Sequence, residues 1–422
     1  RSSGPTWHPP GCSIEHARPC SLPTFSLWAL HFPSDTVHLP ARYLPLLWKG
    51  TPSVQRHADY TRDRLRLLAS KMRELIYPET RPLDQLLVAG PVTERISYDQ
   101  AQQLTGFRPA KMGEQFGPLW ATYWFRVRAI VPAEWAGQRV DLLWESHSEA
   151  TLWMSGRSIQ GLNHDPIGFD QSGRPDAILR EQARGGETIE FQIEMACNRK
   201  FGYENERRKI YRNISLYVLD RAEIALFDPL AWELYFDFSV LQALEAESAR
   251  PDSDLDRCWA GLLLSELNRF ANTYDPADRS TWSTAHAILK ELYRNHNATT
   301  VHELSAIGHA HIDTAWLWPL AETRRKCVRT FSTATNYMDQ YPDYRFACSQ
   351  AQQYAFVKED NPDLFERIRN KVKAGQFIPV GGTWVEPDCN IPSGESLVRQ
   401  FLFGQRFFEK EFGKRCREFW NP

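Results

Sequence analysis

Apolar residues recur with a different period in each successive part of this chain. Residues 1–52 show neither a helical nor a strand period and are rich in Pro, Ser, His and aromatic residues, which predicts a disordered or extraneous extension. From Asp59 to Ile76, Leu and Met recur at helical spacing, and Pro78 ends the pattern. Residues 53–113 are therefore predicted to hold one helix followed by irregular chain.

Residues 114–228 carry the period of two that is typical of β-strands. Aromatic and polar side chains alternate from Trp120 to Val131, and Ser155-Gly156-Arg157 is a turn signal between two short strands. Many short strands separated by Gly and Pro predict an accessory β-sandwich. Residues 229–299 return to helical spacing and are interpreted as a helical linker, with helices expected at Leu230–Ala249, Leu255–Tyr274 and Thr284–Asn295.

Strand and helix signals alternate over residues 300–422. Strands are expected at Val301–Ile307, Arg345–Cys348, Phe377–Gly381 and Glu418–Trp420. Local chemistry marks the helix ends, with starts at Pro319, Asn361 and Ser393 and stops at Gly375 and Gly413. This order indicates a parallel sheet, open or closed into a barrel, so the predicted fold class is α/β plus all-β. Ligands bind such folds where the strands end.

The charge balance narrows the classes of partner. With 50 basic and 52 acidic side chains the net charge is −2, which favours neither nucleic acid nor an anionic membrane surface. The chain has no apolar run near the ~20 residues that span a bilayer. The eight Cys form no CxxC pair, which indicates buried free thiols in a reducing compartment. The 15 Trp suit either sugar-stacking surfaces or ordinary cores.

The sharpest chemical signal is a His-x-His-x-Asp run at the end of the first expected strand, formed by His309, His311 and Asp313. Alternate residues of an extended segment point the same way, so His311 and Asp313 can present an imidazole and a carboxylate to one ion, with His309 on the same side. This donor set suits zinc or a similar divalent metal. The alternative is a surface loop with ordinary His and Asp residues.

Two further segments extend this prediction. Trp316 is placed to form the floor of a sugar site, whereas Trp318 is expected to anchor the core at a helix start. A Gly-Gly pair at the end of the third strand is followed by Trp384, Glu386 and Asp388. The two carboxylates are expected on the side of the first-strand ligands, where they bind sugar hydroxyls or orient a ligating His. The alternative is a pair of solvated loop acids.

Five motifs make the last part of the chain recognisable: HAHIDTAWLWP, ACSQAQQ, GQFIPVGGTWVEPD, IPSGESLVRQFLFGQ and EFGKRCREFWNP. Together they resemble class II α-mannosidases, glycoside hydrolase family 38, and most of all their cytosolic and vacuolar branch. The resemblance extends more loosely back to about His57. It implies a seven-stranded (β/α) barrel-like catalytic domain, of which residues 300–422 form the first part. It also implies one bound divalent metal, Zn²⁺ with Co²⁺ or manganese as alternatives.

The resemblance also implies roles for particular residues. It makes His311 and Asp313 metal ligands, sets Trp316 near bound mannose, and matches Asp388 to an Asp that follows the family's Gly-Gly-Trp motif. Together with Trp316, the strand-end residues Trp384 and Asp388 are predicted to bind substrate. The family's nucleophile is an Asp in a Trp-x-Pro-Asp-x-Phe-Gly run, whose first three positions match Trp420-Asn421-Pro422. That Asp, itself a metal ligand, is expected directly after Pro422, and no catalytic residue is expected within the chain.

The predicted function is retaining, metal-dependent hydrolysis of terminal α-D-mannosides in oligosaccharides, with these 422 residues inactive on their own. A mannose-containing oligosaccharide is the expected partner, a homo-oligomer is allowed, and the expected location is cytoplasmic or vacuolar/lysosomal. Two alternatives stay open. One is a non-catalytic carbohydrate-binding product, and the other is an amidohydrolase-type metal hydrolase, since such barrels also carry His-x-His at the end of strand one.

Overall fold

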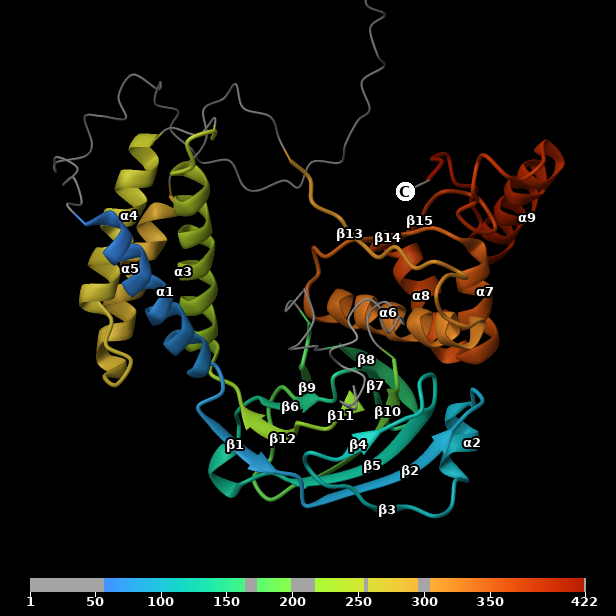
Figure 1. Ribbon diagram of the computed structural model, residues 1–422, viewed down its shortest axis with the longest axis horizontal. Coiled ribbons are helices and arrows are strands. Elements are labelled where there is room, and N and C mark those ends of the chain that lie inside the picture. The colour runs from blue at the N-terminus through green and yellow to red at the C-terminus, as the bar shows by residue number, and fades with distance from the viewer. Residues whose placement is uncertain (1–56, 164–172, 199–216, 254–256, 295–303, 421–422) are drawn as a thin grey trace, which may run out of the picture. The chain divides into compact units, whose positions relative to one another are not determined.

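The computed structural model describes residues 57–163, 173–198, 217–253, 257–294 and 304–420. The extension predicted at residues 1–52 lies outside these ranges. Within them the chain forms a group of helices, an antiparallel sandwich and a parallel α/β unit (Figure 1). None of the helices in the described ranges combines the length and the apolar character needed to cross a bilayer.

Four helices share one apolar core: α1 (Ala58–Glu74), α3 (Pro229–Ser248), α4 (Arg257–Thr273) and α5 (Trp282–Leu292). Asp228 starts α3 by accepting hydrogen bonds from two backbone N–H groups of its first turn. An ion pair of 2.8 Å joins Arg62 of α1 to the buried Glu245 of α3. The three helices predicted for the linker are confirmed. α1 completes the group. The helical period of its sequence shows that one face is apolar, but does not identify the helices that pack against that face.

Two antiparallel sheets share the core of the sandwich. One has the order β1 (Glu79–Pro82), β12 (Arg221–Leu226), β6 (Val140–Glu145), β9 (Asp176–Arg180). The other has the order β3 (Arg108–Pro109), β2 (Gln85–Val92), β5 (Thr122–Ile130), β10 (Thr188–Ala196), β7 (Glu149–Met154), β8 (Arg157–Asn163). β4 (Gln115–Phe116) pairs with β11 (Tyr217–Val218), and a capping box opens the short helix α2 (Tyr98–Gln102). Short 3₁₀ turns occupy Ala133–Trp135 and Arg279–Thr281.

The predicted start of the sandwich at residue 114 is wrong, because β1, β2 and β3 belong to its sheets. β1 pairs with β12 in the register Glu79 to Leu226, and β2 pairs with β5. The segment reads as irregular because Pro82 and Pro91 interrupt its alternation, and β1 tolerates Pro since it lies at a sheet edge. The predicted turn between β7 and β8 is confirmed, with positive φ at Ser155 and Gly156.

The third part is a parallel sheet of three strands, in the order β13 (Gly308–His309), β14 (Phe346–Cys348), β15 (Phe377–Pro379). Its helices are α6 (Leu320–Gln340), α7 (Ala351–Asp360), α8 (Pro362–Lys373) and α9 (Gly394–Phe412). The parallel sheet is therefore confirmed, whereas closure into a seven-stranded barrel stays a prediction.

Two predicted strands of this sheet differ in the structure. Residues 304–307 are not in a strand and 301–303 lie outside the described ranges, so β13 is only two residues long. The ladder begins at Gly308, whose N–H donates to Arg345 just before β14 starts. Glu418–Trp420 is not a strand either, because it makes no ladder with β15. Strand propensity is not enough where a neighbouring strand supplies no hydrogen-bond partners.

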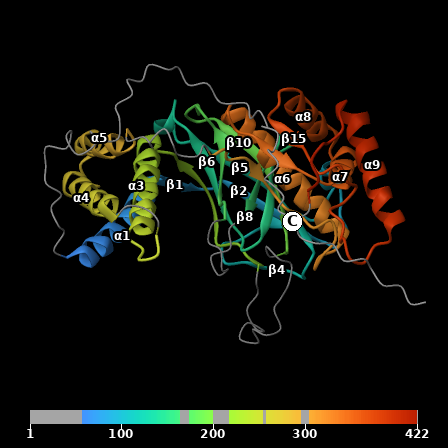
Figure 2. The same ribbon diagram turned by 90° about the horizontal axis from the view of Figure 1, so that it is seen from above.

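α6 packs against β8 of the sandwich, and the two lie side by side in both views (Figures 1 and 2). Glycine allows this approach, since a Cβ at Gly161 of β8 would lie 3.2 Å from the Cβ of Arg329. The Gly161 N–H donates to the Thr333 hydroxyl at 2.9 Å, and the Ser332 and Ser158 hydroxyls are 2.7 Å apart. The sandwich thus positions the first helix of the α/β unit.

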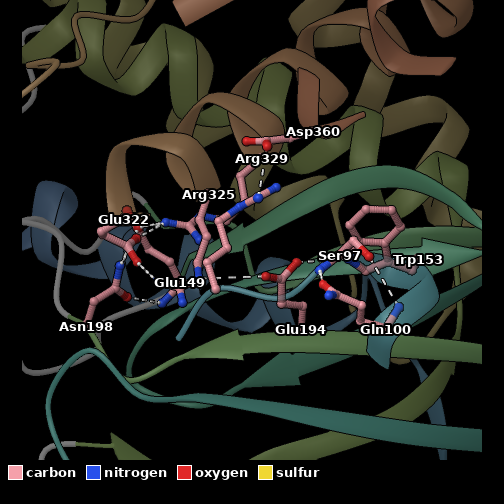
Figure 3. A network of polar contacts seen from close by, with 11 residues as sticks. Ser97, Gln100, Glu149, Trp153, Glu194, Asn198, Glu322, Arg325, Arg329 and Asp360 are labelled. Carbon is pink, nitrogen blue, oxygen red and sulfur yellow. Dashed lines mark hydrogen bonds and ion pairs between the residues drawn. The ribbon is translucent and has the colours of Figure 1, made fainter. Parts of the chain in front are cut away.

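A buried polar network strengthens this contact (Figure 3). Glu149 of β7 lies 2.7 Å from Lys326 and contacts Arg329, which also contacts Glu322. Asn198 donates to Glu149 at 2.8 Å and to Glu322 at 2.5 Å. Burial alone would raise the pKa of Glu149, but the charges of Lys326 and Arg329 outweigh it and lower the pKa from 4.5 to about 2. Losing one partner would leave buried charges unpaired, which is strongly destabilising. The intact network therefore holds α6 against the sandwich.

Candidate functional site

An imidazole between two carboxylates forms the centre of the site. His311 Nε2 lies 3.3 Å from Asp313 Oδ1, and His311 Nδ1 lies 2.8 Å from Glu386 Oε2. The His311 and Asp313 side chains are 40% and 38% exposed, whereas that of Glu386 is only 5% exposed. The structure therefore brings together the two side chains that the sequence predicts as metal ligands. It adds a buried carboxylate behind the imidazole.

The Glu386 carboxylate is held by groups that follow β14. Ser349 Oγ donates to its Oε1, and Gln350 Nε2 donates to its Oε2 at 3.1 Å. Gln350 has a left-handed backbone with φ of 65°, immediately before α7. A non-glycine residue is strained in this conformation, and such strain is retained where the surroundings hold a side chain in a required place.

Two glutamines also fix the backbone between the predicted ligands. Gln350 Nε2 and Gln353 Nε2 donate to the carbonyl of Ile312 at 2.8 and 2.5 Å. Gln350 Oε1 in turn accepts from the Thr314 hydroxyl at 2.6 Å. The residues on both sides of Asp313 are thus hydrogen-bonded to the start of α7. These bonds restrict the positions that the side chains of the loop after β13 adopt.

His309 does not point with the other two members of the His-x-His-x-Asp run. Its Nδ1 lies 2.8 Å from the carbonyl of Ala347 on β14, and its ring centroid lies 4.6 Å from that of Trp420. Its Nε2 is buried without a hydrogen-bond partner among the described residues. The expectation that His309 shares a side with His311 and Asp313 is therefore wrong. β13 ends at His309, so His311 and Asp313 lie beyond the strand on whose alternation the expectation depends.

The two Trp residues of the following loop differ in exposure, as the sequence predicts. Trp316 is 49% exposed, whereas Trp318 is half-buried against the core of the α/β unit. Trp318 Nε1 donates to Thr323 Oγ1 at 3.0 Å, and the Lys326 ammonium lies 4.9 Å from its ring. Trp318 is therefore an anchor at the start of α6, and Trp316 is the more exposed of the two Trp residues that line the adjacent cavity.

Trp384 and Asp388 are engaged in local structure. Trp384 is half-buried and its Nε1 donates to Gln352 Oε1 at 2.9 Å. Asp388 is exposed, and its Oδ1 accepts from the backbone N–H groups of Asn390 and Ile391 at 2.6 and 3.1 Å. It therefore closes a turn. Neither residue lines the cavity beside the pair, so their assignment to substrate binding stays a prediction.

A cavity of about 530 Å³ lies beside the pair. His311, Asp313 and Trp316 line one part of it, and residues of α6 and β8 such as Tyr337 and Asn163 line another. β13 is the edge strand of its sheet within the described residues, and the cavity adjoins it. Ligand sites commonly have this volume, so it suffices for a small sugar.

The pair fits a divalent metal by the chemistry of its donors. An imidazole nitrogen and a carboxylate oxygen are ligands that Zn²⁺ and Co²⁺ accept. No group of three or more His, Cys, Asp or Glu side chains in the described part of the chain is arranged to hold a metal ion. His311 and Asp313 thus supply two donors. The remaining donors of a four-coordinate ion would be water, substrate or residues outside those ranges.

Glu386 is the site residue for which the sequence left two roles open, binding sugar hydroxyls or orienting a ligating His. Its spacing from Trp384 and Asp388 predicted three side chains on one side of the sheet, yet only Glu386 reaches His311. The available signal was a carboxylate shortly after a strand end. That signal does not distinguish Glu386 from Asp388, because the selection depends on which acid the groups after β14 can bind.

Comparisons with known proteins match two parts of the chain. Residues 81–225 match the family "Alpha-mannosidase, jelly roll domain", and residues 301–422 match "Glycosyl hydrolases family 38 N-terminal domain". Alpha-mannosidase G of Dictyostelium discoideum is 40% identical over 375 residues, which are 87% of this chain and 34% of that protein. Alpha-mannosidase 2C1 of Mus musculus is 41% identical over 332 residues, 78% of this chain and 31% of that protein.

The alpha-mannosidase of Saccharomyces cerevisiae is 36% identical over 75% of this chain and 30% of its own length. The chain thus spans about a third of the length of these relatives. Among solved structures, a beta-glucuronidase of Faecalibacterium prausnitzii covers 36% of this chain and 31% of its own, at 16% identity and a TM-score of 0.25. A TM-score of that size defines no common fold.

Proposed function

Since the chain belongs to glycoside hydrolase family 38, the family of class II α-mannosidases, we propose that it contributes the sandwich and the first catalytic strands of a metal-dependent α-mannosidase. The proposed reaction is retaining hydrolysis of terminal α-D-mannosides, in which one carboxylate attacks the sugar and a second, about 5–5.5 Å away, transfers protons. The amidohydrolase alternative is set aside, because the matched families are those of α-mannosidases.

The convergence of His311 and Asp313 is the observation that supports this proposal most. Their donor atoms lie 3.3 Å apart, and both side chains are more than a third exposed. Trp316 and the cavity lie beside them. A sugar hydroxyl can therefore approach the pair from solvent while an indole face is within reach of the apolar face of the ring.

In the proposed mechanism each described residue has a limited role. His311 and Asp313 hold a Zn²⁺ or Co²⁺ ion, which when bound supplies Lewis-acid contacts to hydroxyls of the mannose ring. Trp316 stacks against the sugar. The hydrogen bonds from Gln350 and Gln353 to Ile312 keep the ligand loop in one conformation, which limits the entropy lost on binding.

We expect these 422 residues by themselves to hydrolyse no α-mannoside. Retaining chemistry requires a carboxylate that is free to attack the anomeric carbon. In the proposed site Asp313 binds the metal, and the Glu386 carboxylate is 5% exposed with both oxygens hydrogen-bonded. The proposal therefore assigns the role of nucleophile to neither carboxylate.

Metal titration tests the proposal directly. The purified chain is titrated with Zn²⁺ by calorimetry, alongside His311→Ala, Asp313→Ala and the control Glu395→Gln, an exposed carboxylate on α9. We expect Zn²⁺ binding by the wild type and the control, and a loss of at least about tenfold in affinity for each ligand variant, because each removes one donor. Equal Zn²⁺ affinity in all four proteins would refute the metal site.

Sugar assays test the remaining parts of the proposal. Mannose-containing oligosaccharides are the proposed ligands, so a metal-loaded chain should bind α-mannobiose and leave an aryl α-mannoside intact. Turnover of the aryl mannoside by the 422 residues would contradict the expected lack of hydrolysis. Oligosaccharide binding without turnover in a longer chain with all family motifs would favour the carbohydrate-binding alternative. A cytoplasmic or vacuolar location is proposed with the family and is tested by fractionation.

A further inference from the structure

We infer that α3 carries a dimerisation surface, a stripe of exposed apolar side chains that packs against the same stripe of a second copy of this chain. The stripe consists of Trp232, Phe236, Val240 and Leu244, whose exposed fractions are 38%, 43%, 55% and 42%. Successive members are four residues apart, so they form one continuous ridge over about 18 Å of the helix. The inference is independent of the proposed metal site and of the proposed reaction.

The opposite face of α3 already has its partners. Leu234, Phe238 and Leu241 are buried in the core that α3 shares with α1, α4 and α5 (Figure 1). A surface helix normally combines one such apolar face with a polar one, whereas a helix that is apolar on both faces is covered on both. Single exposed apolar residues are ordinary, but a contiguous row of them marks an interaction site. The second apolar face of α3 therefore requires a partner.

The order of side chains along the stripe favours a second copy as this partner. The aromatic rings of Trp232 and Phe236 occupy its first half, with centroids 4.6 Å apart, and the smaller Val240 and Leu244 occupy its second half. A two-fold axis at the middle of the stripe sets the aromatic half of each copy against the aliphatic half of the other. Large side chains then meet small ones, and two ridges with a spacing of four residues interdigitate at a crossing angle of about −50°.

The area of the stripe suits a reversible dimer. A fully exposed aromatic side chain presents about 150–250 Å², so at these exposed fractions the four side chains together present about 350 Å². Pairing two stripes therefore buries about 700 Å² of apolar side chain, and the polar rims of the two helices bring the total towards about 1,200 Å², the lower end for specific interfaces. We therefore expect a dimer whose population depends on protein concentration.

The charges beside the stripe do not oppose this pairing. Asp237 is hydrogen-bonded to His286 of α5 at 2.6 Å, and Glu247 forms an ion pair of 3.1 Å with Arg250. Glu233 lies five residues before the middle of the stripe, so the antiparallel arrangement keeps the two Glu233 carboxylates about 15 Å apart along the helix axis. That separation exceeds the Debye length of about 8 Å in physiological salt, so their repulsion is largely screened.

Sedimentation velocity at increasing protein concentration tests the surface. The 422-residue chain, Phe236→Arg and Val240→Arg are compared with the control Leu67→Arg, which changes a residue of α1 that is 69% exposed and lies outside the stripe. We expect the wild type and the control to dimerise, and each stripe variant to lose at least about tenfold in dimer affinity, because the dimer would bury an unpaired charge. Far-UV circular dichroism verifies that the variants are folded.

Two results would overturn the inference. Stripe variants that dimerise as tightly as the wild type would show that another surface joins the copies. A wild type that stays monomeric throughout the micromolar range would show that the stripe is covered by another part of the protein or by a different polypeptide.

Cross-linking tests the antiparallel arrangement. Val240→Cys and Leu244→Cys are treated separately with a short bismaleimide, and peptide mass spectrometry identifies the linked positions, because the native Cys389 is also exposed. Along the helix axis the two copies of position 240 should lie about 6 Å apart and those of position 244 about 18 Å apart. We therefore expect links between the two 240 positions and none between the two 244 positions. Equal linking at both positions, or none at position 240, would overturn this arrangement.

Discussion

α9 lies so close to the loop preceding Glu386 that Gly404 leaves no space for a methyl group. A Cβ built on Gly404 lies 2.4 Å from the carbonyl carbon of Thr383, 2.5 Å from Gly382 O and 2.7 Å from Thr383 Cα. All three atoms are backbone, so no side chain can rotate away. For Gly404→Ala we therefore take the upper end of the overpacking cost, about 3 kcal/mol, against about 1 kcal/mol gained in helix propensity. The expected net loss of stability is about 2 kcal/mol.

Gly261 provides the matched control, because it is an exposed glycine inside α4 whose built Cβ meets nothing within 4 Å. Gly261→Ala should gain about 1 kcal/mol from helix propensity alone. Urea unfolding followed by circular dichroism at equal protein concentration should thus separate the two variants by about 3 kcal/mol. A Gly404→Ala protein as stable as the wild type would refute the close packing of α9 on the loop.

Four further predictions follow from individual side chains. The pKa of Glu149 is lowered from 4.5 to about 2, so the contribution of its carboxylate to stability is complete above pH 4.5 and is lost as the pH falls towards 2. Urea unfolding across this pH range should therefore show a weaker acid dependence in Glu149→Gln than in the wild type. A Glu149→Gln profile like that of the wild type would contradict the network. Glu149→Gln should also cost about 3–5 kcal/mol at neutral pH, measured in the same titrations, because it leaves buried cations unpaired. A maleimide should label the exposed Cys389 in the native protein and the buried Cys348 only after denaturation, as read by peptide mass spectrometry; early labelling of Cys348 would show that its site opens. Trp316→Ala removes an edge-to-face contact with Trp318 and should lower the free energy of unfolding by about 0.5–1.5 kcal/mol. It should also weaken mannobiose binding in calorimetry, and unchanged binding would remove Trp316 from the site.

Helix ends in the α/β unit were predictable because their chemistry is local. Ser393 accepts a hydrogen bond from the Ser396 N–H at the start of α9, and Gly413 ends that helix with a φ of 72°. Asn361 likewise accepts from the Leu364 N–H at the start of α8. Each contact spans three residues or fewer, so the sequence contains both partners of the interaction.

The site shows where such reasoning stops. His309 and His311 have equivalent positions in the motif, yet a carbonyl of β14 binds His309 and leaves only His311 for Asp313. Glu386 and Asp388 are equally plausible carboxylates in the sequence. Hydrogen bonds from the groups after β14 select Glu386, whereas Asp388 binds its own turn. Both selections, of His311 over His309 and of Glu386 over Asp388, depend on hydrogen-bond partners that are distant in sequence.

The sequence by itself determined the periods of the helices and strands, their caps and the spacing of His311 and Asp313. These features depend on backbone geometry over a few residues, which any surrounding fold leaves unchanged. Only the tertiary structure decided that β1, β2 and β3 join the sandwich, that β13 is two residues long, and that Glu386 lies beside His311. The reason is that a strand and a buried carboxylate are both defined by hydrogen-bond partners from elsewhere in the chain.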